Sequence, residues 1–164
     1  MEVTFQNPQL TIRLATSNEV AMILSFVTRK SQFDRDMGSF TGTLQTSEEK
    51  IRHTLFGPKP FAYFLLAERE GQPVGFALYY FRYSSFAGQP SLWLDDLYVD
   101  ADRRSQGAGA ALMRVLVQTA KDHQCTHIAW TADARNTRGL KFYDRLGATI
   151  SEQKGNVEAV SKLI

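Results

Sequence analysis

Hydrophobic and polar positions follow two different periods along the chain, and the period changes at Gly107. Before that glycine, the apolar residues fall in short runs typical of buried strands, at residues 10–15, 61–70, 73–83 and 92–99. After it, apolar residues recur three and four positions apart, as on one face of a helix. This helical stripe consists of Ala108, Ala111, Leu112, Val115, Leu116 and Ala120.

Earlier in the chain, two helices are predicted between the first two strands. Ser17 stands where a helix N-cap belongs, ahead of apolar residues at helical spacing. Ser47 is expected to cap a short helix that ends near Phe56, and the polar segment 31–46 is predicted as a loop or broken helix.

After the long helix, the pattern predicts a strand at 126–132 and a further helix that starts at Asn136 and closes with Gly147. Two weaker strands follow, at 148–152 and 157–163. The resulting order, β-α-α-β-β-β-α-β-α-β-β, indicates an α/β (α+β) fold on a single mixed sheet.

Composition narrows the possible classes of protein. The 164 residues suit one domain, and we expect residues 1–164 to form it. A net charge of +2 gives no support for nucleic-acid binding, and no apolar run approaches a membrane span. A lone cysteine, Cys125, fits the cytoplasm. His123 and His127 lack further ligands at suitable spacing, so we expect no metal site.

The glycine-containing segment 103–112 joins a strand to the long helix. Glycines there allow backbone N–H groups to converge, and a helix N-terminus adds unpaired donors and a favourable dipole. Arg103 and Arg104 add positive charge, so the segment is a candidate phosphate cradle. It matches neither a P-loop nor a dinucleotide fingerprint, and a purely structural turn stays open as the alternative.

Strand 92–99 carries two adjacent acids, Asp95 and Asp96. By the pleat, neighbouring residues point to opposite faces, although a bulge would re-aim one of them. A bulged or splayed strand would also free backbone N–H groups that could polarise a carbonyl. The alternative interpretation is edge protection by charge.

Two motifs resemble those of the GCN5-related N-acetyltransferase (GNAT) superfamily. Residues 104–109, RSQGAG, resemble its acetyl-CoA motif, and Asn136 with residues 142–148, FYDRLGA, resembles the motif that follows. Residues 74–113 look most like the diamine (spermidine/spermine) acetyltransferase branch. The resemblance implies a mostly antiparallel sheet of six to seven strands with about four helices, acetyl-CoA as cosubstrate, and a homodimer.

The resemblance also implies the residues that would bind acetyl-CoA. Strand residues 97–99 would pair with the pantetheine arm, and residues 105–110 would hold the pyrophosphate. Ser105 replaces a glycine of the motif and can still donate its N–H if its φ is negative. The implied set is Leu97, Tyr98, Val99, Arg104, Ser105, Gln106, Gly107, Ala108, Gly109, Ala110, Asn136 and Phe142.

Two residues are candidates for catalysis. A substrate ammonium of pKa near 10.4 is only about one part in 2,500 free amine at pH 7, a deficit of roughly 4.6 kcal/mol. Asp95 could attract the ammonium and take its proton, directly or through water. By the resemblance, Tyr143 would face the sulfur and hydrogen-bond the departing thiolate.

The acceptor is expected to be a small primary amine, such as a diamine, an amino acid or a related amine. The resemblance places Phe33 and Asp34 beside Asp95 and Asp96 as acceptor contacts. Acids expected for a polyamine are replaced by residues 84–85 (SS) and 154–155 (KG), which weakens the case for a polycation. Other possibilities are acetylation of a protein N-terminus or lysine, a non-catalytic acyl-CoA-binding module, and a plain interaction domain.

Overall fold

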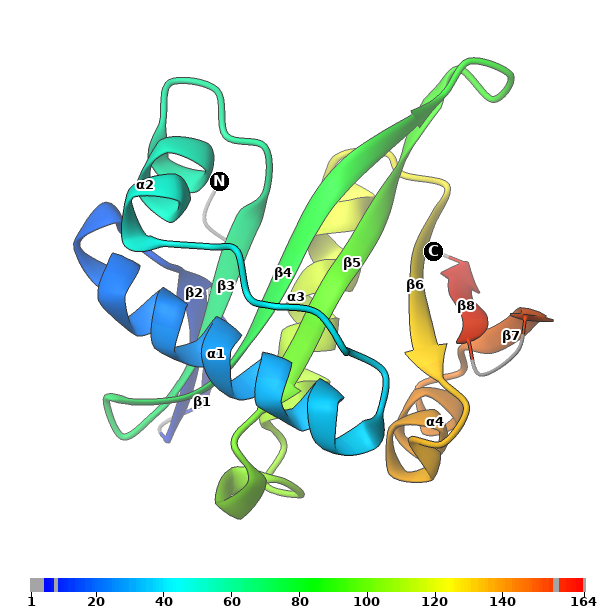
Figure 1. The fold of residues 1–164 in the computed structure, drawn as a ribbon. Coiled ribbons are helices and arrows are strands. Elements are labelled where there is room, and N and C mark those ends of the chain that lie inside the picture. The colour runs from blue at the N-terminus through cyan, green and yellow to red at the C-terminus, as the bar shows by residue number, and fades with distance from the viewer. Residues whose placement is uncertain (1–4, 8, 155–156, 164) are drawn as a thin grey trace.

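The computed structural model describes residues 5–7, 9–154 and 157–163, which form one eight-stranded sheet with helices on both faces (Figure 1). The strand order is β1-β2-β3-β4-β5-β6-β8-β7, and every neighbouring pair is antiparallel except β5 and β6. The strands are β1 (Phe5–Asn7), β2 (Leu10–Leu14), β3 (Tyr63–Arg69), β4 (Gln72–Ser84), β5 (Gln89–Val99), β6 (His127–Asp133), β7 (Thr149–Lys154) and β8 (Val157–Leu163).

Four α-helices accompany the sheet, together with two 3-10 turns at Ser17–Glu19 and Ala101–Arg103. The helices are α1 (Val20–Met37), α2 (Glu48–Phe56), α3 (Ala108–Asp122) and α4 (Thr137–Arg145). The predicted mixed, mostly antiparallel sheet with four helices is therefore confirmed. The three-residue β1, which pairs with β2 at the sheet edge, was not predicted from the pattern.

The structure sets the bounds of the first helix. Segment 31–46, predicted as a loop or broken helix, is helical in its first part, because α1 continues to Met37 and ends at Gly38. Its polar last turns are held by side-chain pairs one turn apart, such as Gln32 Nε2 to Asp36 Oδ1 at 2.8 Å. Ser17 is not the N-cap: the 3-10 turn Ser17–Glu19 is capped by Thr16, whose N–H is accepted by the Glu19 carboxylate at 2.7 Å, and α1 follows directly with Glu19 as its N-cap.

The predicted caps of the two short helices are confirmed. The Ser47 hydroxyl accepts the Lys50 N–H at the start of α2, at 3.2 Å. The Asn136 side chain accepts the Gly139 N–H at the start of α4, at 3.0 Å. These caps satisfy backbone donors that would otherwise lack partners, and they fix where each helix begins.

The sheet has a hydrophobic cluster on each face. On one face α1 and α2 cover aromatic strand residues, with Phe26 packed against Phe76 at a ring-centroid distance of 5.6 Å. On the other face, the predicted stripe of α3 is buried against β2 to β6, and Leu112 and Leu116 are inaccessible to solvent. Both faces of the central strands are therefore core, which explains their near-continuous apolar runs.

The parallel junction between β5 and β6 is short. Only Leu92 with Ile128 and Trp93 with Ala129 are paired across it. The rest of β5, from Leu94 to Val99, is paired with β4 alone among the described strands. This divergence leaves one edge of β5 open toward α4 (Figure 1).

Candidate active site

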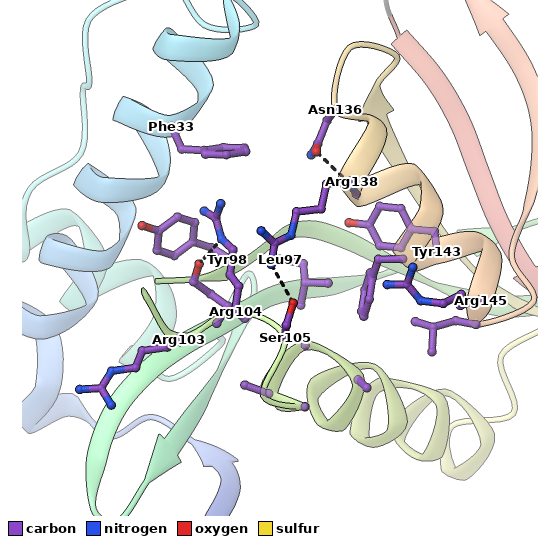
Figure 2. A pocket seen from close by; sticks show the side chains of 18 residues that line it. Phe33, Leu97, Tyr98, Arg103, Arg104, Ser105, Asn136, Arg138, Tyr143 and Arg145 are labelled. Atoms are coloured by element: carbon purple, nitrogen blue, oxygen red, sulfur yellow. Dashed lines mark hydrogen bonds between the residues drawn. The ribbon is translucent and has the colours of Figure 1, made fainter. Parts of the chain in front are cut away.

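A cavity of about 460 Å³ lies where the open edge of β5 meets the start of α3 and one side of α4 (Figure 2). Arginines gather along it from both sides of the opening. Its lining includes most of the residues expected to bind acetyl-CoA: Leu97, Tyr98, Val99, Arg104, Ser105, Gly107, Ala108, Gly109, Ala110, Asn136 and Phe142. Phe33, Arg103, Arg138, Gly139, Tyr143, Arg145 and Leu146 complete it.

The N-terminus of α3 faces this cavity as a set of backbone donors. Gly107 is the N-cap with φ of 90°, a conformation that favours glycine, and a Cβ built there would have no neighbour within 4 Å. The first intrahelical hydrogen bond runs from the Ala111 N–H to the Gly107 carbonyl. The N–H groups of residues 108–110 come before this bond and have no acceptor within the helix. A negative group placed here meets those donors and the positive end of the helix dipole.

Ser105 departs from the expectation for its backbone. Its φ is +61°, not negative, so the residue occupies a left-handed conformation that glycine adopts most easily. The Ser105 hydroxyl accepts a hydrogen bond from Arg138 Nη2 at 2.9 Å, and Figure 2 shows Arg138 reaching from α4 to this loop. The bond joins the two walls of the cavity.

Two aromatic contacts shape the remaining walls. Phe142 lies against Gly109, where an added Cβ would meet the phenyl ring at 3.3 Å. Arg104 donates from Nε to the Val99 carbonyl at 2.9 Å, and its guanidinium lies 4.9 Å from the Phe33 ring centroid. Arg104 is therefore fixed beside the open edge of β5.

Gln106 is the one expected acetyl-CoA contact that does not line the cavity. Its side-chain amide is directed to the Asp102 carbonyl at 3.4 Å, and its own carbonyl accepts from the Arg69 side chain. Both bonds hold the outside of the loop. Gln106 therefore shapes the loop from outside the cavity.

A second cavity of about 310 Å³ lies beside the first and is lined by acids. It contains the four residues expected at the acceptor site, Phe33, Asp34, Asp95 and Asp96. Both cavities share Phe33, Leu97, Asn136 and Tyr143. The residues predicted to bind acetyl-CoA and those predicted to bind the acceptor therefore line two adjoining cavities.

A β-bulge explains how two adjacent acids reach one cavity. Opposite β5, Leu78 pairs with Asp96 and Tyr79 pairs with Leu94, which leaves Asp95 without a partner residue in the register. The extra residue re-aims the strand, so the bulge rather than simple pleat counting sets the two carboxylates. Asp95 is exposed, whereas Asp96 keeps only 24% of its side chain exposed.

Lys30 connects the acids on α1 with those on β5. Its ammonium is bonded to Asp34 and lies 3.3 Å from Asp96 Oδ1. Burial disfavours the ammonium, but the Asp96 and Asp34 carboxylates outweigh this effect and raise the pKa of Lys30. Burial also raises the pKa of Asp96, and the nearby Lys30 charge offsets part of that rise.

Tyr143 stands between the two cavities. Its ring packs on Trp130 at 4.9 Å and on Phe142 at 5.3 Å between centroids. Burial, followed by the negative charge of Asp96, raises the pKa of Tyr143 well above its usual range. The phenol therefore stays protonated and able to donate at any ordinary pH.

Sequence reasoning missed several residues of the site, among them Lys30, Trp130 and Arg138. Trp130 lines the acid cavity, and its buried Nε1 has no hydrogen-bond partner among the described residues. Lys30 could have been found had the first helix been continued past residue 30, because Asp34 follows one turn later. Arg138 carries no comparable signal, since its partner is 33 residues away.

Residues 84, 85 and 154, which stand where acids are expected for a polyamine, do not line the acid cavity. Ser84 ends β4 and Ser85 follows it, and neither lines that cavity. Lys154 ends β7 and is exposed. Gly155 lies outside the described residues.

Two searches over the described part of the chain found no candidates. No helix there is long and apolar enough to cross a bilayer. No group of three or more histidine, cysteine, aspartate or glutamate side chains there could hold a metal ion.

The sequence profile of the acetyltransferase (GNAT) family matches residues 30–148, which contain both cavities. The chain belongs to this family. It is an acyltransferase, and acetyl-CoA-dependent N-acetylation is its class of reaction. The matched span covers the bulged strand, the glycine turn and the helix that carries Tyr143.

Similar proteins agree with this membership. The acetyltransferase is 30% identical to a thialysine N-epsilon-acetyltransferase of Bos taurus, over 88% of this chain and 87% of that protein. It is 34% identical to a human spermidine/spermine N(1)-acetyltransferase-like protein 1, over 61% of this chain and 15% of that protein. A GNAT-family acetyltransferase from Streptococcus pneumoniae shares the fold with a TM-score of 0.76 at 19% identity, covering 95% and 99% of the two chains.

Proposed function

We propose that the protein transfers the acetyl group of acetyl-CoA to a small primary amine, such as a diamine, an amino acid with a terminal amine, or a related amine. The observation that carries the proposal is the meeting of two unlike cavities at Tyr143. One is lined by arginines and helix N–H groups, which suit phosphates, and the other by carboxylates, which suit an ammonium. The names of the similar proteins include small amines, which also supports this acceptor class.

Acetyl-CoA fits the first cavity chemically. The pyrophosphate would lie at the N-terminus of α3, where Gly107 leaves open space, with residues 104–110 around it. The pantetheine amides would pair with the free edge of β5 at residues 97–99. Asn136 and Phe142 would contact the middle of the cosubstrate, and Arg103, Arg138 and Arg145 supply charge that could also reach its phosphates.

We assign the proton-accepting role to Asp95. Asp96 is already engaged by Lys30, whereas none of the ion pairs among the described residues includes Asp95. Asp95 is also exposed at the bulge, where water can relay the proton from the substrate ammonium. The ring of Phe33 would then contact the amine, while Asp34 and Asp96, both bonded to Lys30, would add negative charge to the cavity without taking the proton.

In the transfer step, the neutral amine nitrogen attacks the thioester carbon, the carbon–sulfur bond breaks, and the nitrogen loses one proton to water as the amide forms. Backbone N–H groups on the open edge of β5 would polarise the carbonyl oxygen. Tyr143 would donate a hydrogen bond to the departing sulfur and then its proton. With reference pKa values near 10 for a phenol and 8.5 for a thiol, full transfer is uphill by about 2 kcal/mol, and the raised pKa of Tyr143 makes it more so. Hydrogen bonding in the transition state therefore precedes proton transfer.

A thiol-release assay tests this function. The protein is mixed with acetyl-CoA and a panel of small amines, amino acids, N-terminal peptides and lysine peptides. Release of free thiol with small amines is the expected result. Release only with peptides would indicate a protein acetyltransferase, and tight acetyl-CoA binding without release would indicate a non-catalytic acyl-CoA-binding module.

Domain extent, assembly and location are three further parts of the proposal. We propose one acetyltransferase domain over residues 1–164, a homodimer, and a cytoplasmic location. The single cysteine supports a reducing compartment, and the resemblance to the diamine branch supports the dimer. Light scattering of the purified protein would measure the dimer directly.

A further inference from the structure

Lys30 is a cation in a cavity whose proposed role is to bind cations. Among the described residues that line the acid cavity, Lys30 is the one lysine or arginine. Only 18% of its side chain is exposed, so its ammonium is held inside rather than extended into solvent. It bonds to Asp34 and lies 3.3 Å from Asp96, as a second substrate ammonium would be expected to do.

The carboxylates of the cavity differ in what they already bind. Asp133 is paired with Arg135 at 2.6 Å, and Asp34 and Asp96 share Lys30. Asp95 is the lining carboxylate outside the described ion pairs. The cavity therefore offers an ammonium a free partner at Asp95, while the place between Asp34 and Asp96 is filled.

We propose that Lys30 determines acceptor specificity by taking the place of a second substrate ammonium. An acceptor whose second positive charge must enter this cavity meets the Lys30 charge and loses access to Asp34 and Asp96. An acceptor with one ammonium binds Asp95 without that conflict. This inference rests on the proposed function. It narrows the acceptor class to amines that bring one positive charge into the acid cavity.

A purely structural role for Lys30 predicts a different outcome. The ion pairs tie α1 to β5, so removing Lys30 would lower stability under either interpretation. Only the specificity role predicts that the preference between acceptors changes. Lys30→Arg retains the charge and the tie, and Lys30→Met retains the apolar stem without the charge.

The test compares pentylamine with 1,5-diaminopentane, which differ by one terminal amine. Steady-state kinetics with saturating acetyl-CoA give kcat/KM for each acceptor in the wild type, Lys30→Met, Lys30→Arg and the control Lys121→Met, an exposed lysine on α3. We expect pentylamine to be preferred by the wild type. In Lys30→Met the ratio of kcat/KM for the diamine over the monoamine should rise about tenfold or more, a change equal to ~1.4 kcal/mol. Lys30→Arg and Lys121→Met should keep the wild-type ratio.

Each outcome decides the matter. An unchanged ratio in Lys30→Met, or an equal change in Lys121→Met, would overturn the role of Lys30 while leaving the proposed function in place. If Lys30→Met does not fold, the wild type still decides, because a preference for the diamine would contradict the inference. No thiol release with either amine in the wild type would overturn the proposed acceptor class itself, and the inference with it.

Discussion

Tyr143 is the residue at which the two halves of the proposed reaction meet. Its ring is held by Trp130 and Phe142, so its position depends on packing rather than on a hydrogen bond from the described residues. A phenol with a raised pKa is a poor full acid but a dependable donor. The same burial that weakens its acidity keeps it protonated throughout the working range of pH.

Replacing Tyr143 by phenylalanine should lower kcat about 100-fold, the low end for a lost general acid. Because the ring and its packing are retained, affinity for acetyl-CoA should change little. Thiol-release kinetics measure the first effect and calorimetric titration with acetyl-CoA measures the second. Tyr83→Phe, at a tyrosine that is 72% exposed, is the control. Wild-type turnover in Tyr143→Phe would show that another group meets the sulfur.

For Asp95→Asn, the expected loss of activity depends on pH. The variant must rely on amine that is already free in solution, and that fraction falls about tenfold for each pH unit below the amine pKa. The loss in kcat/KM should therefore be largest below pH 7 and smallest near pH 9. A loss that is equal at all pH values would assign Asp95 to positioning instead. Asp102→Asn, on the exposed turn after β5, serves as the control.

Much of the chemistry at this scale was predictable from residue types and motif spacing. Asn136, Phe142, Tyr143 and the glycine turn lie together as expected. What the sequence could not show was that Asp95 is the extra residue of a bulge in β5, exposed to solvent, while Asp96 is paired with Lys30. A bulge depends on the register with β4, and no local pattern in 92–99 encodes it.

At the scale of elements, the turn between β5 and α3 lines the first cavity and also holds a residue with a strained backbone. Ser105 adopts a left-handed conformation that costs a non-glycine residue roughly 1–2 kcal/mol. Its hydroxyl accepts from Arg138 on α4. Compared with glycine, Ser105 therefore has a less favourable backbone conformation but adds a hydrogen bond between the two walls of the cavity.

Two substitutions at Ser105 separate these effects. Both Ser105→Gly and Ser105→Ala remove the hydroxyl, but only alanine keeps the penalty for positive φ. We expect Ser105→Gly to be about 1 kcal/mol more stable than Ser105→Ala, or roughly 2–4 °C in Tm for a protein of this size. Urea unfolding at neutral pH measures the difference. Equal stabilities would mean that the loop relaxes out of its left-handed conformation.

Element boundaries were predictable where a capping residue stood alone, as at Ser47 and Asn136. They were not predictable where tertiary contacts extend a helix. The last turns of α1 are polar, and contacts with β5 add to their local pairs: Phe33 packs on Tyr98, and Lys30 is paired with Asp96. The sequence pattern alone predicts a loop for such a segment, because it lacks an apolar stripe.

At the scale of the whole molecule, both cavities lie where the sheet separates between β5 and β6. Strands β1 to β5 form one antiparallel run, and β6, β8 and β7 form another. The acid cavity is lined from both runs and from α1, since Asp95 and Asp96 come from β5 and Trp130 and Asp133 from β6. The class of fold was predictable from the order of elements, but the opening between β5 and β6 was not, because it arises from pairing between distant segments.

The two residue pairs that join β5 to β6 also bear on how the protein opens. With so little backbone bonding at the junction, amide hydrogens of β6, β7 and β8 should exchange with solvent as one cooperative unit, ahead of those in β2 to β5. Acetyl-CoA would contact β5, α3 and α4 together and so bridge the junction. Hydrogen-exchange mass spectrometry with and without the cosubstrate should show slowed exchange in β6 and β8, two strands that do not line its cavity. Slowing confined to the glycine turn would mean that the two runs of strands open independently of the cosubstrate.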